Sequence, residues 1–197
     1  MKSLKFFKPS LATTLAIVLA WLLSVRPAEA GYTVTLQQVG PDVVATGSGA
    51  IDLTGLTFYR SATLNPGLRP SGVVYSALIN TGPISSNVDI YSSPTGPTSF
   101  GSSRSPTSAS SGSGYMVGIF TSLFGNTLSV PTGYVSGTAL SGMAIYSGKT
   151  FCTLGVTPGT YVWTWGGGAN QNFTLQIPPA INCAPTPRPR PTPAPRP

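Results

Sequence analysis

The chain has 197 residues and a net charge of +7, from 11 basic and 4 acidic residues, and it contains no histidine. The absence of histidine excludes the Ser–His–Asp and Cys–His nucleophile systems and the usual histidine-containing metal sites. With 23 glycines and 20 prolines, the composition is unsuited to long helices, and it lacks the period of collagen.

Residues 1–30 have the pattern of a secretory signal peptide. Three lysines precede the apolar run Leu11–Leu23. Ala28 and Ala30 then occupy the small-residue positions that a signal peptidase recognises, which predicts cleavage between Ala30 and Gly31. A membrane anchor is the alternative, but a spanning helix needs roughly 20 apolar residues, and this run has 13. We therefore expect a secreted protein of the extracellular space or cell envelope.

Removal of residues 1–30 changes the charge balance. The remaining chain has seven basic residues against three aspartates, a net charge of +4. Three of these positive charges lie in the last ten residues, so residues 31–183 carry only +1. A nucleic-acid-binding domain needs a clustered basic face, and we therefore expect no nucleic-acid partner.

Short segments of strand-forming residues, bounded by turn residues, recur through residues 31–183. Tyr32–Val39 alternates apolar with polar residues, as a half-buried strand does, and Gly40-Pro41 turns it into a second strand at Asp42–Leu53. The further expected strands are Val73–Ile79, Val88–Tyr91, Tyr115–Thr121, Thr127–Val130, Gly142–Ser147, Thr150–Val156, Thr160–Trp165 and Phe173–Ile177. This spacing predicts an all-β fold, a single antiparallel β-sandwich or jelly-roll-like domain.

Two segments depart from the strand pattern. In Ser92–Gly114, 20 of 23 residues are Ser, Thr, Gly or Pro, too few of them apolar to offset the entropy of ordering. We expect a flexible surface loop within the domain at residues 92–114, and a linker between domains is the alternative. Ala184–Pro197 has proline at every second position, which predicts a disordered, extended tail.

Few residues remain that could carry catalysis. A two-carboxylate glycosidase would have to use Asp42, Asp52 and Asp89, because no glutamate remains after cleavage. These aspartates are better explained as turn and loop residues. Calcium requires several converging carboxylates. We expect no metal, no cofactor and no enzymatic activity.

The segment Thr160–Trp165 carries a row of aromatic residues. Tyr161, Trp163 and Trp165 stand at i, i+2 and i+4, so a strand places all three on one face. Buried, the row forms part of the core. Exposed, it can stack on sugar rings, and a third alternative is a strand face shared with a partner. We favour the core and leave the other two interpretations open.

The two cysteines, Cys152 and Cys183, form an even pair in a chain expected in an oxidising compartment. Such a pair predicts a disulfide, which would join a strand near the end of the domain to the start of the tail. Two buried or free thiols are the alternative.

Three strings, Thr95–Gly101, Val130–Gly142 and Thr150–Ile177, carry a resemblance. Together they resemble secreted bacterial proteins of the PEP-CTERM (exosortase substrate) type, whose β-rich bodies end in a hairpin similar to TPGTYVWTWG. The resemblance implies a role at the cell envelope or in an extracellular matrix, in a family of unknown activity. Such proteins usually close with Pro-Glu-Pro, an apolar span and a basic cluster. This chain ends in TPRPRPTPAPRP and lacks that sorting signal, which puts anchoring by an exosortase in question.

The sequence as a whole predicts a non-catalytic secreted surface or extracellular-matrix protein that acts as a structural or interaction module. The alternative is a carbohydrate-binding module that uses the aromatic row. The partners we expect are polysaccharide or other envelope and matrix components. Membrane contact is expected only through the signal peptide or through weak attraction of the tail arginines to anionic headgroups. The oligomeric state is left open.

Overall fold

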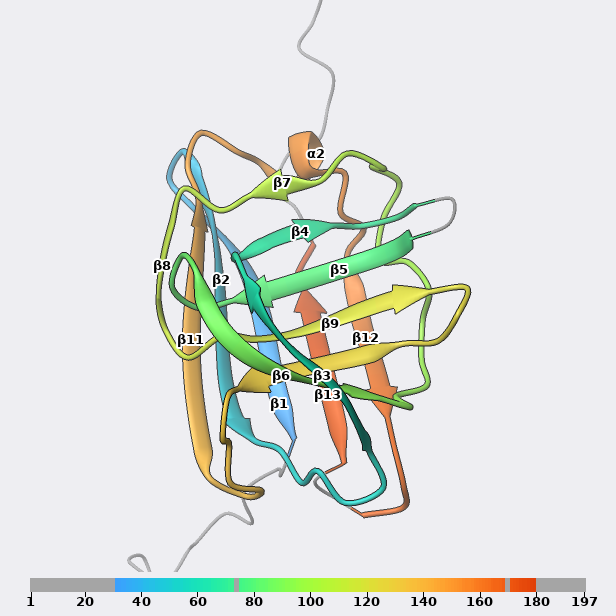
Figure 1. Ribbon diagram of the computed structural model, residues 1–197. Coiled ribbons are helices and arrows are strands. Elements are labelled where there is room, and N and C mark those ends of the chain that lie inside the picture. The colour runs from blue at the N-terminus through green and yellow to red at the C-terminus, as the bar shows by residue number, and fades with distance from the viewer. Residues whose placement is uncertain (1–30, 73–74, 169–170, 180–197) are drawn as a thin grey trace, which may run out of the picture.

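The computed structural model describes residues 31–72, 75–168 and 171–179, which form two β-sheets packed face to face (Figure 1). Sheet A has the strand order β12 (Gly159–Thr164), β13 (Asn172–Ile177), β1 (Tyr32–Val39), β2 (Asp42–Ala50), β11 (Ala139–Tyr146) and β8 (Ser111–Gly114). Sheet B has the order β3 (Thr57–Leu64), β6 (Ser86–Ser92), β10 (Thr127–Pro131), β9 (Val117–Ser122), β5 (Tyr75–Thr81), β4 (Gly67–Arg69) and β7 (Thr107–Ser108). The expected all-β sandwich is confirmed.

Strand pairing is antiparallel throughout the described strands except at one position. The expected hairpin of β1 and β2 is present, with Val39 opposite Asp42 across its turn. On its other side β1 runs parallel to β13, with Tyr32 opposite Phe173. The sandwich is therefore not purely antiparallel, because the first and last described strands lie side by side in the same direction.

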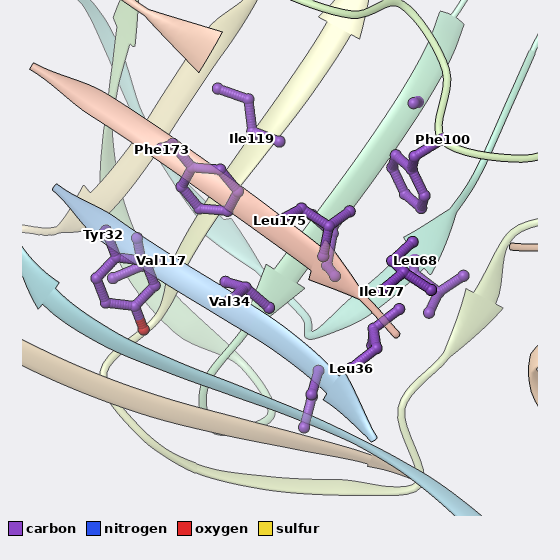
Figure 2. Packing of buried hydrophobic residues seen from close by; sticks show 14 of the residues in the cluster. Tyr32, Val34, Leu36, Leu68, Phe100, Val117, Ile119, Phe173, Leu175 and Ile177 are labelled. Carbon is purple, nitrogen blue, oxygen red and sulfur yellow. The ribbon is translucent and has the colours of Figure 1, made fainter. Parts of the chain in front are cut away.

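The main core lies between the sheets and follows the two-residue period of the strands. Figure 2 shows side chains from β1 and β13 filling the space beside residues of sheet B and Phe100. Each of these strands alternates buried with more exposed residues. Burial of each such side chain contributes about 1.5–3 kcal/mol relative to exposure. The fully buried members include Tyr32, Val34, Leu36, Ile79, Phe100, Val117, Ile119, Leu128, Trp163, Phe173 and Leu175.

Sheet B is curled. Its strands β3 and β4 are joined by only Asn65 and Pro66, yet β4 is the fifth strand along from β3 in the sheet. A flat sheet would separate them by about 24 Å, whereas the connection spans at most about 11 Å. Asn65 also fixes the joint, because its Oδ1 accepts a 2.9 Å hydrogen bond from the amide of Ser85.

The curl encloses a second, smaller core on the face of sheet B that points away from sheet A. Val88, Ile90 and Met116 are buried there, with Ala62 and Leu64 of β3 packed against them at its border. The register shows that this is the other face. Tyr91 lies opposite the main-core residue Leu128, so its neighbour Ile90 points the opposite way.

The segment Thr150–Val156, expected as a strand, contains a helical turn instead, α2 (Phe151–Leu154). Thr150 caps the turn, since its Oγ1 accepts from the Thr153 amide while the Thr153 side chain bonds back to the Thr150 amide. Gly155 ends the helix in the left-handed conformation, with φ of 67°, which a glycine adopts without strain. The expectation was wrong because these local caps outweigh the β propensity of the segment.

The segment Ser92–Gly114 is not the featureless loop that its composition suggests. It contains β7, which pairs with β4 in sheet B, and β8, which pairs with β11 in sheet A. Its one large apolar residue, Phe100, is fully buried. The polar stretches gain order by pairing with strand edges, so the segment passes along both sheets and anchors itself through Phe100.

Candidate functional site

The aromatic row of β12 lies in the main core. Trp163 is fully buried, Trp165 is 3% exposed, and the half-buried Tyr161 packs against the same cluster. The Trp163 ring meets Phe173 edge-on, with ring centroids 5.8 Å apart. The two tryptophans therefore present no ring face to solvent in this structure. The stacking platform that the sequence left open is not formed, because the row points between the sheets.

Both indole N–H groups donate to carbonyls of distant segments, as buried tryptophans usually require. Trp163 Nε1 donates to the Pro97 carbonyl at 2.9 Å, and Trp165 Nε1 donates to the Asp52 carbonyl at 2.7 Å. Gly96 allows the first contact, because a Cβ at that position would lie 2.6 Å from Trp163 Cδ1. These two hydrogen bonds thus hold two loops against the aromatic row.

Tyr161, the third member of the row, holds the turn before β12. Its hydroxyl donates to the Thr157 carbonyl at 3.0 Å, and its ring meets Phe100 edge-on at 6.1 Å between centroids. Burial raises the pKa of the Tyr161 hydroxyl. All three aromatic residues are therefore engaged in contacts within the fold.

Asp52 joins three loops at one end of the sandwich. Its Oδ1 accepts from the Thr54 amide at 2.9 Å and from Ser136 Oγ at 3.1 Å, and its Oδ2 accepts from Gln171 Nε2 at 3.2 Å. Gln171 is buried, and its Nε2 also donates to the Thr54 carbonyl at 2.8 Å. The hydrogen bond from the Thr54 amide holds the pKa of Asp52 below its ordinary value. The carboxylate therefore holds the three loops together as a hydrogen-bond acceptor.

Asp42 and Asp89 have the same role elsewhere. Asp42 Oδ1 accepts from the Gly148 amide at 2.8 Å. Asp89 accepts from the Gly133 amide at 3.0 Å and from Ser61 Oγ at 2.7 Å, and the first of these bonds holds its pKa low. A general acid near neutral pH needs a raised carboxyl pKa. Asp52 and Asp89 are shifted in the opposite direction.

Of the remaining sequence-predicted residues, Cys152 lies inside the described chain and the others lie at or beyond its limits. Cys152, on α2, is disulfide-bonded. Its expected partner Cys183 lies outside the described residues, so the Cys152–Cys183 pairing stays a prediction. Ala28 and Ala30 also lie outside them, and Gly31 is the first described residue, directly before β1. The tail 184–197 is likewise outside.

The outward face of sheet A carries uncharged side chains, all polar except Val162, that the sequence analysis did not single out. They belong to four adjacent strands, β12, β13, β1 and β2, and alternate with the core residues of those strands. The strand register aligns them in two rows, Val162–Thr174–Thr33–Ser48 and Thr160–Gln176–Thr35–Thr46. None of these eight residues is charged. Threonine at alternate positions of neighbouring strands was the signal that could have revealed this face.

A shallow hollow of about 530 Å³ lies at one end of this face. Thr35, Thr160 and Gln176 line it together with Pro158 and Pro178. Thr35 Oγ1 donates to Gln176 Oε1 at 3.4 Å across the strands. The rest of the lining is Gly159, Ile177 and Pro179, so the hollow offers hydroxyl and amide groups beside apolar surface and no charge, and a neutral ligand would suit it better than an ion.

Within the described ranges, no helix is both long and apolar enough to cross a membrane. The same residues contain no group of three or more Cys, Asp, Glu or His side chains that could hold a metal ion. No protein-family model, curated protein or solved structure matches the chain.

Proposed function

We propose that this protein is a non-catalytic, secreted surface or extracellular-matrix protein that acts as a structural or interaction module. The observation that carries the proposal is the engagement of all three carboxylates of the described chain. Asp42, Asp52 and Asp89 each accept hydrogen bonds from the amides of turns and loops. A carboxylate held as a structural acceptor is poorly suited to proton transfer, and the pKa values of Asp52 and Asp89 are lowered by these hydrogen bonds.

Three features of the sequence support the extracellular setting. Residues 1–30 have the pattern of a cleaved signal, and the body is almost uncharged. The string that resembles PEP-CTERM-type proteins includes the turn before β12 and the strand itself. Secretion into the envelope or matrix accounts for these features together.

Fractionation of the producing cells tests the proposal. The protein should be found with the envelope or matrix material, with Gly31 first by intact mass, and should rebind that material after extraction. The Asp89→Asn variant should rebind equally well, because the carboxylate only braces a turn. Protein that remains inside the cell, or a hydrolytic activity on matrix polysaccharide that Asp89→Asn abolishes, would contradict the proposal.

A second candidate, binding of a neutral polysaccharide, is favoured by the outward face of sheet A. Strand geometry sets its hydroxyl and amide groups at regular intervals, about 4.8 Å between strands and about 6.7 Å along each strand. The hollow at Thr35, Thr160 and Gln176 adds a concave end to this face. This candidate differs from the aromatic platform considered from the sequence, since Trp163 and Trp165 are buried.

A matched pair of variants tests the second candidate. Thr160→Lys places a charge at the hollow, and Thr57→Lys places the same charge on an exposed threonine of sheet B. In a screen against neutral polysaccharides, Thr160→Lys should weaken binding about tenfold or more and Thr57→Lys should not. Equal binding by both variants would exclude this face.

A further inference from the structure

The two sheets have four edge strands in the described chain, and three of them are protected. β12 is covered at its C-terminal end by Thr95, whose amide and carbonyl exchange 2.8 Å hydrogen bonds with Thr164. β7 has two residues, and β8 has four, all Ser or Gly. Short or covered edges offer few unpaired backbone groups to another chain.

The fourth edge, β3, is long and uncovered. It has eight residues, and among the described strands it pairs only with β6. Six of its residues are exposed, including Phe58 and Tyr59 at 55% and 64%. Its sequence TFYRSATL contains no proline or lysine and has one charged residue, Arg60, whereas protected edges usually carry proline or several charged side chains.

One irregularity limits how much of β3 can pair. The register shifts between Phe58 and Arg60, so Tyr59 forms a bulge. Beyond it the stretch Arg60–Leu64 is regular and lies opposite β6 residue by residue. Alternate backbone N–H and C=O groups of such a stretch point away from β6 and have no strand partner.

We propose that this edge binds a second copy of the chain, through antiparallel pairing of Arg60–Leu64 about a twofold axis at Ala62. The inference deepens the proposed interaction role and rests on it. The pairing sets Arg60 opposite Leu64 and Ser61 opposite Thr63, and Ala62 meets its own copy. The result is one continuous sheet made from sheet B of both copies.

The second core supplies the reason for a second copy as occupant. Ala62 and Leu64 stand at its border and are only partly buried. Arg60, Ala62 and Leu64 alternate along the strand and so share this face. In the symmetric pair, the partner's Ala62 covers this border, and the aliphatic stem of the partner's Arg60 covers Leu64.

Charge is compatible with self-association. Arg60 is the one charged residue of β3, and the proposed register separates the two arginines by four residues, about 13 Å along the strands. This exceeds the Debye length of about 8 Å at physiological ionic strength. Residues 31–183 carry a net charge of only +1, so the copies do not repel strongly.

A charge-swap experiment at the axis tests the register. The full-length gene is expressed in its host, and the exported protein is analysed by sedimentation velocity over a wide concentration range. The unaltered protein should show a monomer–dimer equilibrium. Ala62→Lys and Ala62→Asp each place like charges directly opposite one another and should each raise the dimer dissociation constant about tenfold or more. An equimolar mixture of the two variants should restore dimerisation.

Two more variants keep the test decisive if changes at Ala62 disturb the border of the second core. Thr63→Lys is at an exposed position and brings like charges to about 7–8 Å diagonally, so it should also weaken the dimer. Phe124→Lys adds the same charge to the tip of the β9–β10 hairpin, where Phe124 is 85% exposed, and should leave the dimer unchanged.

The proposal is overturned by a monomer at every concentration, by dimers that persist in all the β3 variants, or by a mixture that fails to restore a dimer lost in both Ala62 variants. Loss of the dimer in Phe124→Lys would also overturn it. Rebinding to envelope material is a separate measurement, so failure of the dimer and failure of the proposed function are distinguishable.

Discussion

Two edge strands of this sandwich carry similar residues and have opposite surroundings. β12 has the sequence GTYVWT and β3 has TFYRSATL. Trp163 of β12 is fully buried, while Tyr59 of β3 is 64% exposed. The segment around Thr95–Pro97 covers the edge at β12, through backbone bonds to Thr164 and the carbonyl that accepts from Trp163.

The comparison shows that the neighbouring segment, rather than the residue type, decides whether the aromatic rings of a strand are buried. At β12 the low-complexity segment supplies the missing neighbour, and the aromatic rings become core. At β3 Phe58 contacts Tyr91, and the Arg60 guanidinium lies 5.8 Å from the Tyr59 ring centroid, but no described strand pairs with the outer edge. A strand without its cover is a natural place for another chain to bind.

The largest expected effect follows from removing an aromatic ring from each strand. Trp163→Ala should lower the free energy of unfolding by about 3–5 kcal/mol, because it leaves a cavity in the main core. Tyr59→Ala, the matched change on β3, should alter it by less than about 1 kcal/mol. Chemical denaturation of the two variants beside the unaltered protein measures both values. Equal losses would show that the two strands do not differ as described.

The disulfide should have the next largest effect. The expected Cys152–Cys183 bridge closes a loop of about 30 residues that contains β12 and β13 but not β3, and its reduction should cost roughly 3–4 kcal/mol. Denaturation with and without reductant measures the loss. Thiol titration of the unfolded, unreduced protein should detect no free thiol, and two titratable thiols would refute the pairing.

A smaller effect is expected from disturbing the cover itself. Gly96→Ala places a Cβ within 2.6 Å of Trp163 Cδ1 and 2.7 Å of the Val162 carbonyl. Such overpacking should destabilise the protein by about 1–3 kcal/mol. Gly167 has no atom within 4 Å of an added Cβ, so Gly167→Ala is the control. A Gly96→Ala protein as stable as the control would mean that the cover does not pack closely on β12.

The smallest effect concerns acid stability. The pKa values of Asp52, beside the aromatic row, and Asp89, beside β3, are lowered in the fold. Each contributes stability above the unfolded aspartate pKa of about 3.9, and this contribution is lost as the pH falls through the lower folded value. The denaturant concentration at the midpoint of unfolding should therefore decrease as the pH is lowered below about 4. Asp52→Asn and Asp89→Asn should each make the midpoint less dependent on pH in this range. An unchanged pH dependence in both variants would contradict the stabilising role of the two carboxylates.

The sequence is informative where a strand alternates regularly. Tyr32–Val39 is predicted with the bounds that β1 has, because every second side chain faces the core. β3 was missed because the bulge at Tyr59 interrupts the two-residue period, although Phe, Tyr and Thr favour strands. α2 was missed because its cap uses Thr153, where the usual capping box has Glu or Gln.

The sequence predicts that the aromatic row shares one face of a strand, but it does not decide whether that face is buried. Alternation places Tyr161, Trp163 and Trp165 on one face, yet whether that face is covered depends on segments far away in the chain. Pro97 and Asp52, which accept the indole hydrogen bonds, are 66 and 113 residues from their tryptophans. The cover comes from a segment whose composition indicates a loop. No local pattern reveals such a contact.

Peptide-resolved hydrogen exchange, measured at a low and a high protein concentration, compares β12 and β3 most directly. The amides of β12 should be protected equally at both concentrations, because the main core and the covering segment belong to one chain. The amides of β3 should exchange faster than those of β12 in dilute solution and slow down in concentrated solution, as a second copy pairs with Arg60–Leu64. Exchange in β3 that does not depend on concentration, or exchange in β12 as fast as in β3, would contradict the distinction between a covered and an open edge.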